Sequence, residues 1–324
     1  MRLLKLVPDN TNLPFVSLRK WAFGLTILLT LAAVALVFAR GLNLGVDFVG
    51  GLMIEEKFVT QPSTDKLRTA IDNLHLGEVR LQTVGNDGKT ISIKLPPPES
   101  TEKDATNKVV NAVQVAVNKL YPDARFSKQD AVSGKVSNEL IWKGVLAVVL
   151  AVLGIGLFAI FRFEWQFGVS TVVAIMHDVL MTLGFFALTQ FEFDLNIVAA
   201  VLTIIGYSIN DKIVIDDRIR ENMRRYRKME MPEIVDLSVN ETLPRTVMTS
   251  LTILLALFAL LIFGGHVLQG FTSAMILGIF VGTYSSIYVS SSLLISLGLR
   301  AEPQADATPP TAKKAERVAY KDMP

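Results

Sequence analysis

Six stretches of about 20 mostly apolar residues constrain the fold of this chain more than any other feature. A helix needs about 20 such residues to cross the bilayer core of about 30 Å. The stretches cover residues 21–39, 140–161, 167–188, 195–215, 247–263 and 271–299. The sequence therefore predicts an all-α membrane bundle of six transmembrane helices.

The composition agrees with a membrane protein and excludes several other classes. Hydrophobic residues make up 51% of the 324 residues, and charged residues only 19%. The net charge of +2 is too small to neutralise a nucleic-acid backbone, so no nucleic-acid partner is expected. Because the chain has no cysteine and three histidines, disulfides and thiolate metal sites are excluded, and we expect neither a metal nor another cofactor.

Basic residues gather on one side of the predicted spans. They are frequent in the N-terminal segment 1–20, in the loop 218–244 and in the tail 301–324, whereas the loops 189–194 and 264–269 contain none. Cytoplasmic loops carry the excess of Lys and Arg in membrane proteins. Both termini are therefore predicted to be cytoplasmic, and the tail, rich in Pro, Ala and charge, is predicted to be disordered.

One hydrophilic segment, residues 41–138, lies between the first span at 21–40 and the five further spans at 139–300, so we expect it outside the cytoplasm. Its pattern predicts strands at 52–59, 79–84, 90–95 and 124–126, and helices at 64–74 and 102–120. The order βαββαβ predicts a small ferredoxin-like α+β domain. Residues 133–137 are expected to link it to the second span.

Three of the apolar stretches contain ionisable residues, which are costly in hydrocarbon and therefore need a partner or a role. Lys143, in the second stretch, lies close to an outer end and can extend its ammonium group into water. His177 and Asp178 lie near the midplane of the third span. The fourth span carries Ser208, Asn210 and Asp211 within about one turn. These side chains are candidates for a polar network inside the membrane.

Asp211 and Arg245 are predicted to face each other between the fourth and fifth spans. Asp211 falls in the inner third of the fourth span, and Arg245 opens the fifth span after Pro244. Burial disfavours a charged carboxylate and a nearby guanidinium favours it, so a small helix movement can load and release a proton. One proton crossing 100 mV releases about 2.3 kcal/mol, and several could drive a domain movement. A structural salt bridge explains the same pair.

The motif GVDFVGG at residues 45–51 connects the first span to the first predicted strand. Its residues Gly45, Gly50 and Gly51 permit backbone conformations and close approaches that larger residues exclude. We interpret the motif as a structural joint, which Asp47 caps or bonds.

Five motifs carry a resemblance to a known family. They are GVDFVGG at 45–51, HDVLMTLGFFAL at 177–188, GYSINDKIVIDDRIREN at 206–222, LPRTVMTSLT at 243–252 and GTYSSIYVSS at 282–291. With them the chain resembles the SecF family, the smaller membrane subunit of the SecD and SecF protein-export accessory complex. This family has a resistance-nodulation-division (RND) architecture, and the resemblance covers the chain apart from its tail.

The resemblance implies a transport subunit of a bacterial inner membrane rather than an enzyme. It implies SecD, the SecYEG channel and the translocating preprotein as partners, with YajC as a further candidate. The subunit would use the proton-motive force to help pull out a preprotein that SecA has pushed in, and the residues matching Asp211 and Arg245 would couple proton movement. The chain departs from the family pattern at Lys212, where a small or hydroxyl residue is expected, and at Asp216.

Three other functions stay open at this stage. The chain could be a structural scaffold without proton traffic. A half of an RND-type small-molecule or lipid exporter is a second alternative, but it predicts a larger outside domain or a duplicated half. An intramembrane aspartyl protease using Asp178 and Asp211 is a third, and it needs a GxGD motif that the relevant span lacks.

Overall fold

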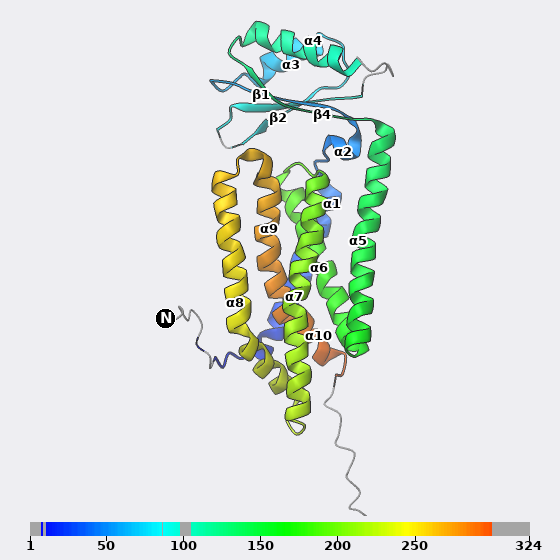
Figure 1. Cartoon of the computed structure of the whole chain (residues 1–324), viewed down its shortest axis with the longest axis vertical. Helices are drawn as coiled ribbons and strands as arrows, with labels where there is room; N and C mark the ends of the chain where they lie inside the picture. The colour runs from blue at the N-terminus through cyan, green and yellow to red at the C-terminus, as the bar shows by residue number, and fades with distance from the viewer. Residues whose placement is uncertain (1–7, 9–10, 86, 98–104, 300–324) are drawn as a thin grey trace, which may run out of the picture.

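The computed structural model describes residues 8, 11–85, 87–97 and 105–299. A helical bundle forms one end of the molecule and a small α+β domain the other (Figure 1). Within the described residues, six helical segments are long and apolar enough to cross a membrane, which confirms the predicted number of spans. The expected disordered tail, 301–324, lies outside the described residues.

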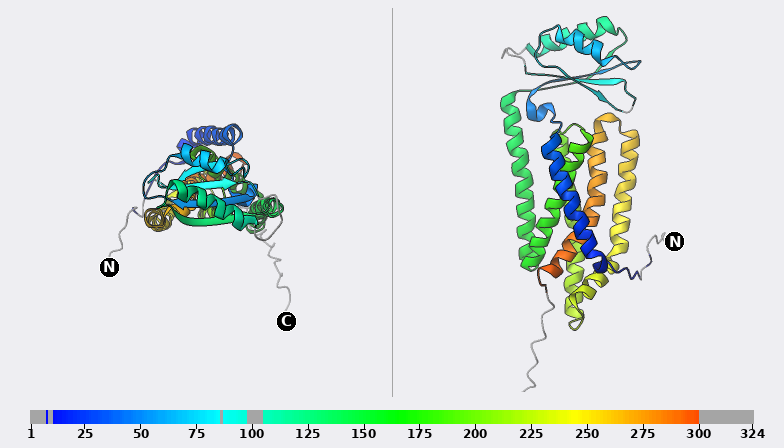
Figure 2. Two further views of the ribbon diagram at one scale, coloured as in Figure 1. Left: turned by 90° about the horizontal axis from the view of Figure 1, so that it is seen from above. Right: turned by 180° about the vertical axis from the view of Figure 1, so that it is seen from behind.

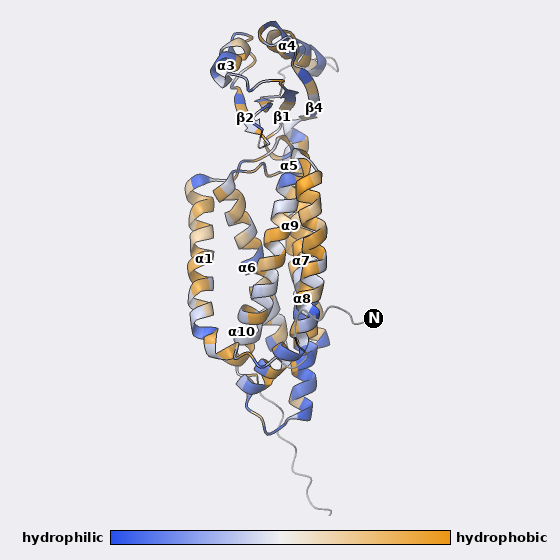
Figure 3. Ribbon diagram, turned by 90° about the vertical axis from the view of Figure 1, so that its left-hand side faces the viewer, coloured by the Kyte–Doolittle hydropathy of each residue, from blue (hydrophilic) through white to orange (hydrophobic). Residues whose placement is uncertain are grey.

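The membrane bundle consists of six helical segments. They are α1 (Arg19–Arg40), preceded by the 3₁₀ turn η1 (Val16–Leu18), then α5 (Gly134–Arg162), α6 (Trp165–Thr189), α7 (Leu195–Arg225), α8 (Met231–Phe263), and α9 (His266–Tyr284), which continues through the π-helical segment η2 (Ser285–Ser290) into α10 (Ser291–Ser296). Apolar residues cover the bundle, and hydrophilic residues gather at the lower ends of α7 and α8 (Figure 3). This distribution is typical of a protein that crosses a bilayer.

The helices differ in how deeply they are buried. α6 and α7 form the centre of the bundle, whereas α1 and α5 are mostly exposed. α1 lies on the outside of the bundle against α6 (Figure 2). Gly184 permits this contact because a Cβ there would overlap Ala33, and Gly278 on α9 likewise leaves room for Ile204 on α7. Small residues at these positions let the helix backbones approach closely.

The region expected as a cytoplasmic loop, 218–244, is mostly helical. α7 continues to Arg225 and α8 already begins at Met231, so Arg245 lies inside α8 rather than at its start. Pro244 inside the helix removes a backbone hydrogen bond, and α8 bends toward the lower end of α7 (Figure 1). Polar contacts such as that between Arg218 and Glu241, at 2.7 Å, join the two extensions.

The domain that we expect outside the cytoplasm, called the outside domain below, is a four-stranded sheet covered on one face by two helices. Its elements are α2 (Val46–Val49), β1 (Gly51–Lys57), α3 (Thr64–Asp72), β2 (Arg80–Val84), β3 (Thr90–Leu95), α4 (Ala105–Leu120) and β4 (Arg125–Val132). The strand order is β2-β3-β1-β4, and all neighbours are antiparallel. Leu52 and Ile54 alternate toward α3 and α4 and form the core with Ile91 and Ile93.

The predicted order βαββαβ is present, but the ferredoxin-like description fits only loosely. The short helix α2 precedes β1 and was not predicted, and the pairing of β1 with β4 shifts register between Glu55 and Glu56. β4 is much longer than the predicted strand 124–126, because its half-exposed polar residues give no apolar pattern. The expected linker 133–137 is absent, since α5 begins at Gly134 and Ser133 caps it.

Candidate functional site

A buried polar cluster surrounds Asp178 in the middle of the bundle. Asp178 Oδ2 accepts hydrogen bonds from Ser208 Oγ at 2.5 Å, from Ser285 Oγ at 3.0 Å and from Lys212 Nζ at 3.3 Å. Its Oδ1 lies 3.1 Å from His177 Nδ1. All five side chains are buried, so α6, α7 and η2 meet through polar groups at this level.

Lys212 is satisfied by this cluster although its side chain is completely buried. Its ammonium group also donates to Ser208 Oγ and, at 3.2 Å, to Ser285 Oγ. Three acceptors match the three donors of an ammonium group. An unpaired charge would cost several kcal/mol here, so the pair with Asp178 is what makes Lys212 compatible with the membrane interior.

The π-helical segment η2 brings Ser285 into the cluster. Ser286 donates to the carbonyl oxygen of Gly282 at 2.7 Å, and Ser285 Oγ, whose one proton is directed to Asp178, lies 3.1 Å from the same oxygen. A Cβ on Gly282 would lie 3.1 Å from Ser208 Oγ, so the glycine allows this segment to approach α7. Single-turn π segments inside α-helices occur frequently at functional sites.

The structure places Asp211 and Arg245 on neighbouring packed helices but not in direct contact. Asp211 is 3% exposed, and its Oδ2 has no hydrogen-bond partner among the described residues. Arg245 on α8 is exposed and acts on Asp211 electrostatically. The ion pairs within 4.0 Å in the described part of the chain do not include these two residues, and the buried pair at this depth is Asp178 with Lys212.

Asn210 lies outside the cluster that it was predicted to join. It is exposed, as are Thr203 and Gly206 on the same helix. Residues spaced by three and four share one helix face, so α7 presents a stripe of small and polar residues toward the bilayer. Apart from the neighbouring backbone of α7 itself, no atom of the described residues comes within 4 Å of a Cβ built on Gly206, which leaves space beside this stripe.

The glycine motif forms a joint between the domain and the bundle. Gly45 N donates to the carbonyl oxygen of Phe193 at 2.9 Å, and Asp47 Oδ2 accepts from Leu195 N, the first residue of α7, at 3.0 Å. Gly50 and Gly51 have φ of +77° and +123°, a region that favours glycine. A Cβ on Gly51 would overlap the carbonyl oxygen of Leu95.

Side chains that the sequence analysis missed dock the sheet onto the loop between α6 and α7. Asn43 Nδ2 donates to Gln82 Oε1 at 2.9 Å and to the carbonyl oxygen of Gln190 at 3.0 Å. Lys94 pairs with Glu192 at 3.1 Å. These partners come from distant parts of the chain, so local patterns give no signal for them.

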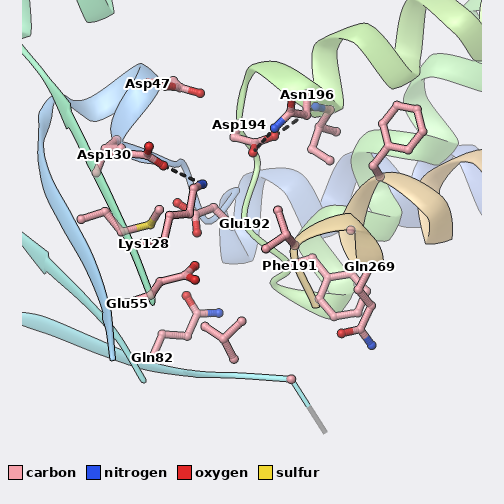
Figure 4. Close-up of a pocket in the computed structure, with 18 of the residues that line it drawn as sticks. Asp47, Glu55, Gln82, Lys128, Asp130, Phe191, Glu192, Asp194, Asn196 and Gln269 are labelled. Atoms are coloured by element: carbon pink, nitrogen blue, oxygen red, sulfur yellow. Dashed lines mark hydrogen bonds and ion pairs between the residues drawn. The ribbon is translucent and has the colours of Figure 1, made fainter. Parts of the chain in front are cut away.

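A polar cavity of about 340 Å³ lies beside this docking contact. Carboxylates from the sheet, from α2 and from the α6–α7 loop line it, together with Lys128 (Figure 4). Burial raises the pKa of Glu192, although the nearby Lys94 opposes that shift. Within the described residues, no group of three or more His, Cys, Asp or Glu side chains could hold a metal ion.

Comparison with known families decides the identity of the chain. Residues 112–300 match the family "Protein export membrane protein SecD/SecF, C-terminal", and residues 35–55 match the "SecD/SecF GG Motif". The chain belongs to the SecD/SecF family. The first match covers the buried cluster and both Asp211 and Arg245, and the second covers the glycine joint of this SecD/SecF member.

Individual relatives and solved structures of the SecD/SecF family agree with this assignment. Protein translocase subunit SecF of Rhodobacter capsulatus is 42% identical over 306 residues, which cover 91% of this chain and 92% of that protein. The SecF subunit of Rickettsia prowazekii is 38% identical over 292 residues, 90% of this chain and 93% of that protein.

The fold is similar to crystal structures of SecDF. That of SecDF from Thermus thermophilus, described as a translocon-associated membrane protein, has a TM-score of 0.80 and 36% identity, and the match covers 90% of this chain but 40% of that one. A SecDF structure in a super-membrane-facing form has a TM-score of 0.66. The chain therefore spans about two fifths of the length of SecDF.

Proposed function

We propose that the chain is an accessory subunit of the Sec protein-export machinery, which works with a SecD partner and uses the proton-motive force to promote preprotein translocation. The proposal places it in the inner membrane of a bacterium, with both termini cytoplasmic. Membership of the SecD/SecF family supports the export role. Asp211, a buried carboxylate with one oxygen left without a hydrogen-bond donor among the described residues, carries the proton-coupling part.

Asp211 and Arg245 would couple proton movement to a shift between α7 and α8. Burial disfavours a charged carboxylate, and an approaching guanidinium favours it. Because Arg245 acts on Asp211 from a distance in this conformation, a small approach of the two helices would release a proton and a separation would bind one. Each proton that crosses 100 mV supplies about 2.3 kcal/mol for such a movement.

The contacts at the outer end of α7 offer a route from this movement to the domain. Asp47 accepts a hydrogen bond from the backbone of Leu195 at 3.0 Å, and Asp194 caps the same helix end through Ile197 N at 3.1 Å. A displacement of α7 therefore acts directly on the joint that carries β1. The outside domain is the part that we expect to contact the translocating preprotein.

A SecD partner is expected on the exposed stripe of α7. Thr203, Gly206 and Asn210 are exposed at membrane depth, where polar groups are costly unless another helix covers them. The chain matches 40% of the SecDF chain, and this supports a separate SecD chain as the partner that covers the stripe. The SecYEG channel would contact the assembled complex, and YajC is a further candidate partner.

Reconstituted vesicles containing the chain, SecD and the SecYEG channel test this proposal. Asp211→Asn and Arg245→Met should each lower proton conductance and late-stage preprotein release while the complex still assembles. Asp217→Asn is the matched control, since Asp217 is an exposed carboxylate of α7 that pairs with Arg162 at 3.1 Å. Unchanged release in both variants would reject proton coupling and leave a structural scaffold.

A further inference from the structure

Two buried carboxylates, Asp178 and Asp216, share the single ammonium group of Lys212 on one face of α7. A third, Asp211, is buried on the neighbouring face of the same helix, where Lys212 also acts on it electrostatically. Asp216 lies four residues after Lys212 on α7, so the two side chains share a helix face. Asp216 is 2% exposed, and no described residue hydrogen-bonds to it or pairs with it within 4.0 Å. Lys212 acts on Asp216 electrostatically, but the three N–H donors of Lys212 bond Asp178, Ser208 and Ser285.

The charge balance of this face requires one proton. An ionised carboxylate that is buried without a donor costs several kcal/mol. When Lys212 bonds Asp178, Asp216 is therefore stable as the neutral acid. If the ammonium group moved to Asp216, Asp178 would be the carboxylate without it and would stay ionised, because Ser208 and Ser285 already donate hydrogen bonds to it. The proton of Asp216 would then be released.

The geometry allows the ammonium group to reach either carboxylate. Helical side chains lean toward the N-terminus of their helix, so that of Asp216 leans toward Lys212, about 6 Å away along the axis. The side chain of Lys212 leans toward Ser208 and has to turn back to reach Asp216. The four-carbon stem of Lys212 is flexible. The other titratable groups near it are His177 on α6 and Asp211, which faces a different direction on α7.

Polar groups continue from this cluster toward the inner end of the bundle. Ser290 on η2 donates to Ser170 Oγ on α6 at 3.3 Å, and Thr171 Oγ1 is buried without a partner among the described residues. Both serines are buried at the contact of α6 with η2. Hydroxyl groups at such a contact can bind water or pass protons, which an apolar interface cannot do.

We propose that Lys212 is shared between Asp178 and Asp216, and that Asp216 is a proton-binding carboxylate on the inner side of the cluster. Asp216 transfers its proton to water when the ammonium group moves to it, and binds a proton from water when that group returns to Asp178. Lys212 keeps its three protons throughout. This role deepens the proposed proton-driven function and rests on it for its use in export, but the sharing itself can be tested alone.

Infrared spectroscopy of the full chain in lipid nanodiscs tests the sharing, because the C=O stretch of a protonated carboxyl group is resolved from the amide bands. Asp216→Asn should remove one such band. Asp178→Asn should remove the same band, since Lys212 then moves to Asp216 and ionises it. Asp217→Asn should leave the band in place, because Asp217, next to Asp216 in the sequence, is an exposed carboxylate. A band that persists in Asp178→Asn, or in Asp216→Asn, overturns the proposal.

A second variant covers the case in which Asp216→Asn does not fold. Lys212→Met removes the ammonium group and leaves both carboxylates without it, so the spectrum should gain a protonated-carboxyl band. The matched control is Lys143→Met, since Lys143 is an exposed lysine that pairs with Glu139 at 2.7 Å. An unchanged spectrum in Lys212→Met contradicts the sharing.

Proton-driven preprotein release in vesicles that contain the SecD partner and the channel tests the role in export. Asp216→Asn should lower the rate at least about tenfold, because a positioned proton-transfer group typically contributes 10²- to 10⁴-fold. Asp217→Asn should leave it unchanged. If the wild type shows no dependence on the proton gradient, the proposed function fails, and the infrared bands still decide the sharing. Normal release by Asp216→Asn rejects its role as a proton carrier.

Discussion

Gly51 is the residue at which the backbone requirement of the joint is strictest. Its φ of +123° and the carbonyl oxygen of Leu95 at the place of a Cβ both exclude a side chain. We expect Gly51→Ala to lower the free energy of unfolding of the outside domain by about 2 kcal/mol or more. Pulse proteolysis of the full chain in nanodiscs across a urea series measures this. Gly134→Ala, where no atom lies within 4 Å of the new Cβ, should have little effect.

Glu56 makes the stability of the domain depend on pH. It lies on β1 opposite Ile91, on the face that carries Leu52 and Ile54 toward the core, and burial raises its pKa from 4.5 to about 7. The folded state therefore binds this proton more tightly than the unfolded chain does. The contribution of protonated Glu56 to the free energy of unfolding is present at low pH and is lost as the pH rises from about 4.5 to about 7.

The predicted pH effect can be measured by comparing wild type with Glu56→Gln. At about 1.4 kcal/mol for each tenfold change in proton affinity, the wild-type domain should lose up to roughly 3 kcal/mol of unfolding free energy over this range. Glu56→Gln should remove most of that loss in the same proteolysis assay. Glu78→Gln, an exposed carboxylate of the same domain, should retain it. An equal pH dependence in Glu56→Gln would contradict the assignment.

At the scale of elements, contact between α7 and α9 depends on Gly278. A Cβ at this position would overlap the side chain of Ile204, which is buried. Overpacking of this kind costs about 1–3 kcal/mol, so Gly278→Ala should lower the thermal unfolding temperature of the detergent-solubilised chain. Gly270→Ala on the same helix is the control, because its Cβ would make an ordinary contact of 3.7 Å with Ile197. An unchanged melting temperature for Gly278→Ala would show that α7 and α9 can accommodate a Cβ at this contact, and would contradict the prediction.

The elements also show how far the sequence can predict this fold. Apolar stretches predicted all six spans, because a transmembrane helix depends on composition over about 20 residues. They did not predict the lower halves of α7 and α8, whose polar residues pack through contacts such as Arg218 with Glu241. β4 was predicted too short for a related reason, since an edge strand with half-exposed polar residues has no alternating apolar pattern.

The candidate site was predicted in part. The sequence singled out Asp178, Ser208 and Asp211 because polar residues in an apolar stretch are conspicuous. It could not assign partners, because the contact between Lys212 and Asp178 depends on how α6 and α7 rotate against each other. Ser285 lies in the motif GTYSSIYVSS, which carried the family resemblance but was assigned no role in the site, and only the π-helical turn of η2 brings it to the carboxylate.

At the scale of the whole molecule, one side of the central helix α7 is left uncovered by the part of the chain that the structure describes. We expect the stripe that contains Gly206 to bind a helix of the SecD partner, so Gly206→Leu should reduce co-purification of SecD about tenfold, which corresponds to about 1.4 kcal/mol. Gly154→Leu on α5 is the control, since this glycine is also exposed with no atom within 4 Å of its Cβ. Equal recovery of SecD with both variants would place the interface elsewhere.

The direct passage from β4 into α5 has a mechanical consequence. Ser133 alone separates the strand from the helix, and its side chain already bonds the helix backbone at Val136 N, 3.5 Å away. No flexible linker separates β4 from α5 here, so the strand cannot rotate independently of the helix. A tilt of α5 in the bilayer would therefore rotate β4 and the rest of the sheet in the same direction. The orientation of the outside domain would depend on the tilt of α5.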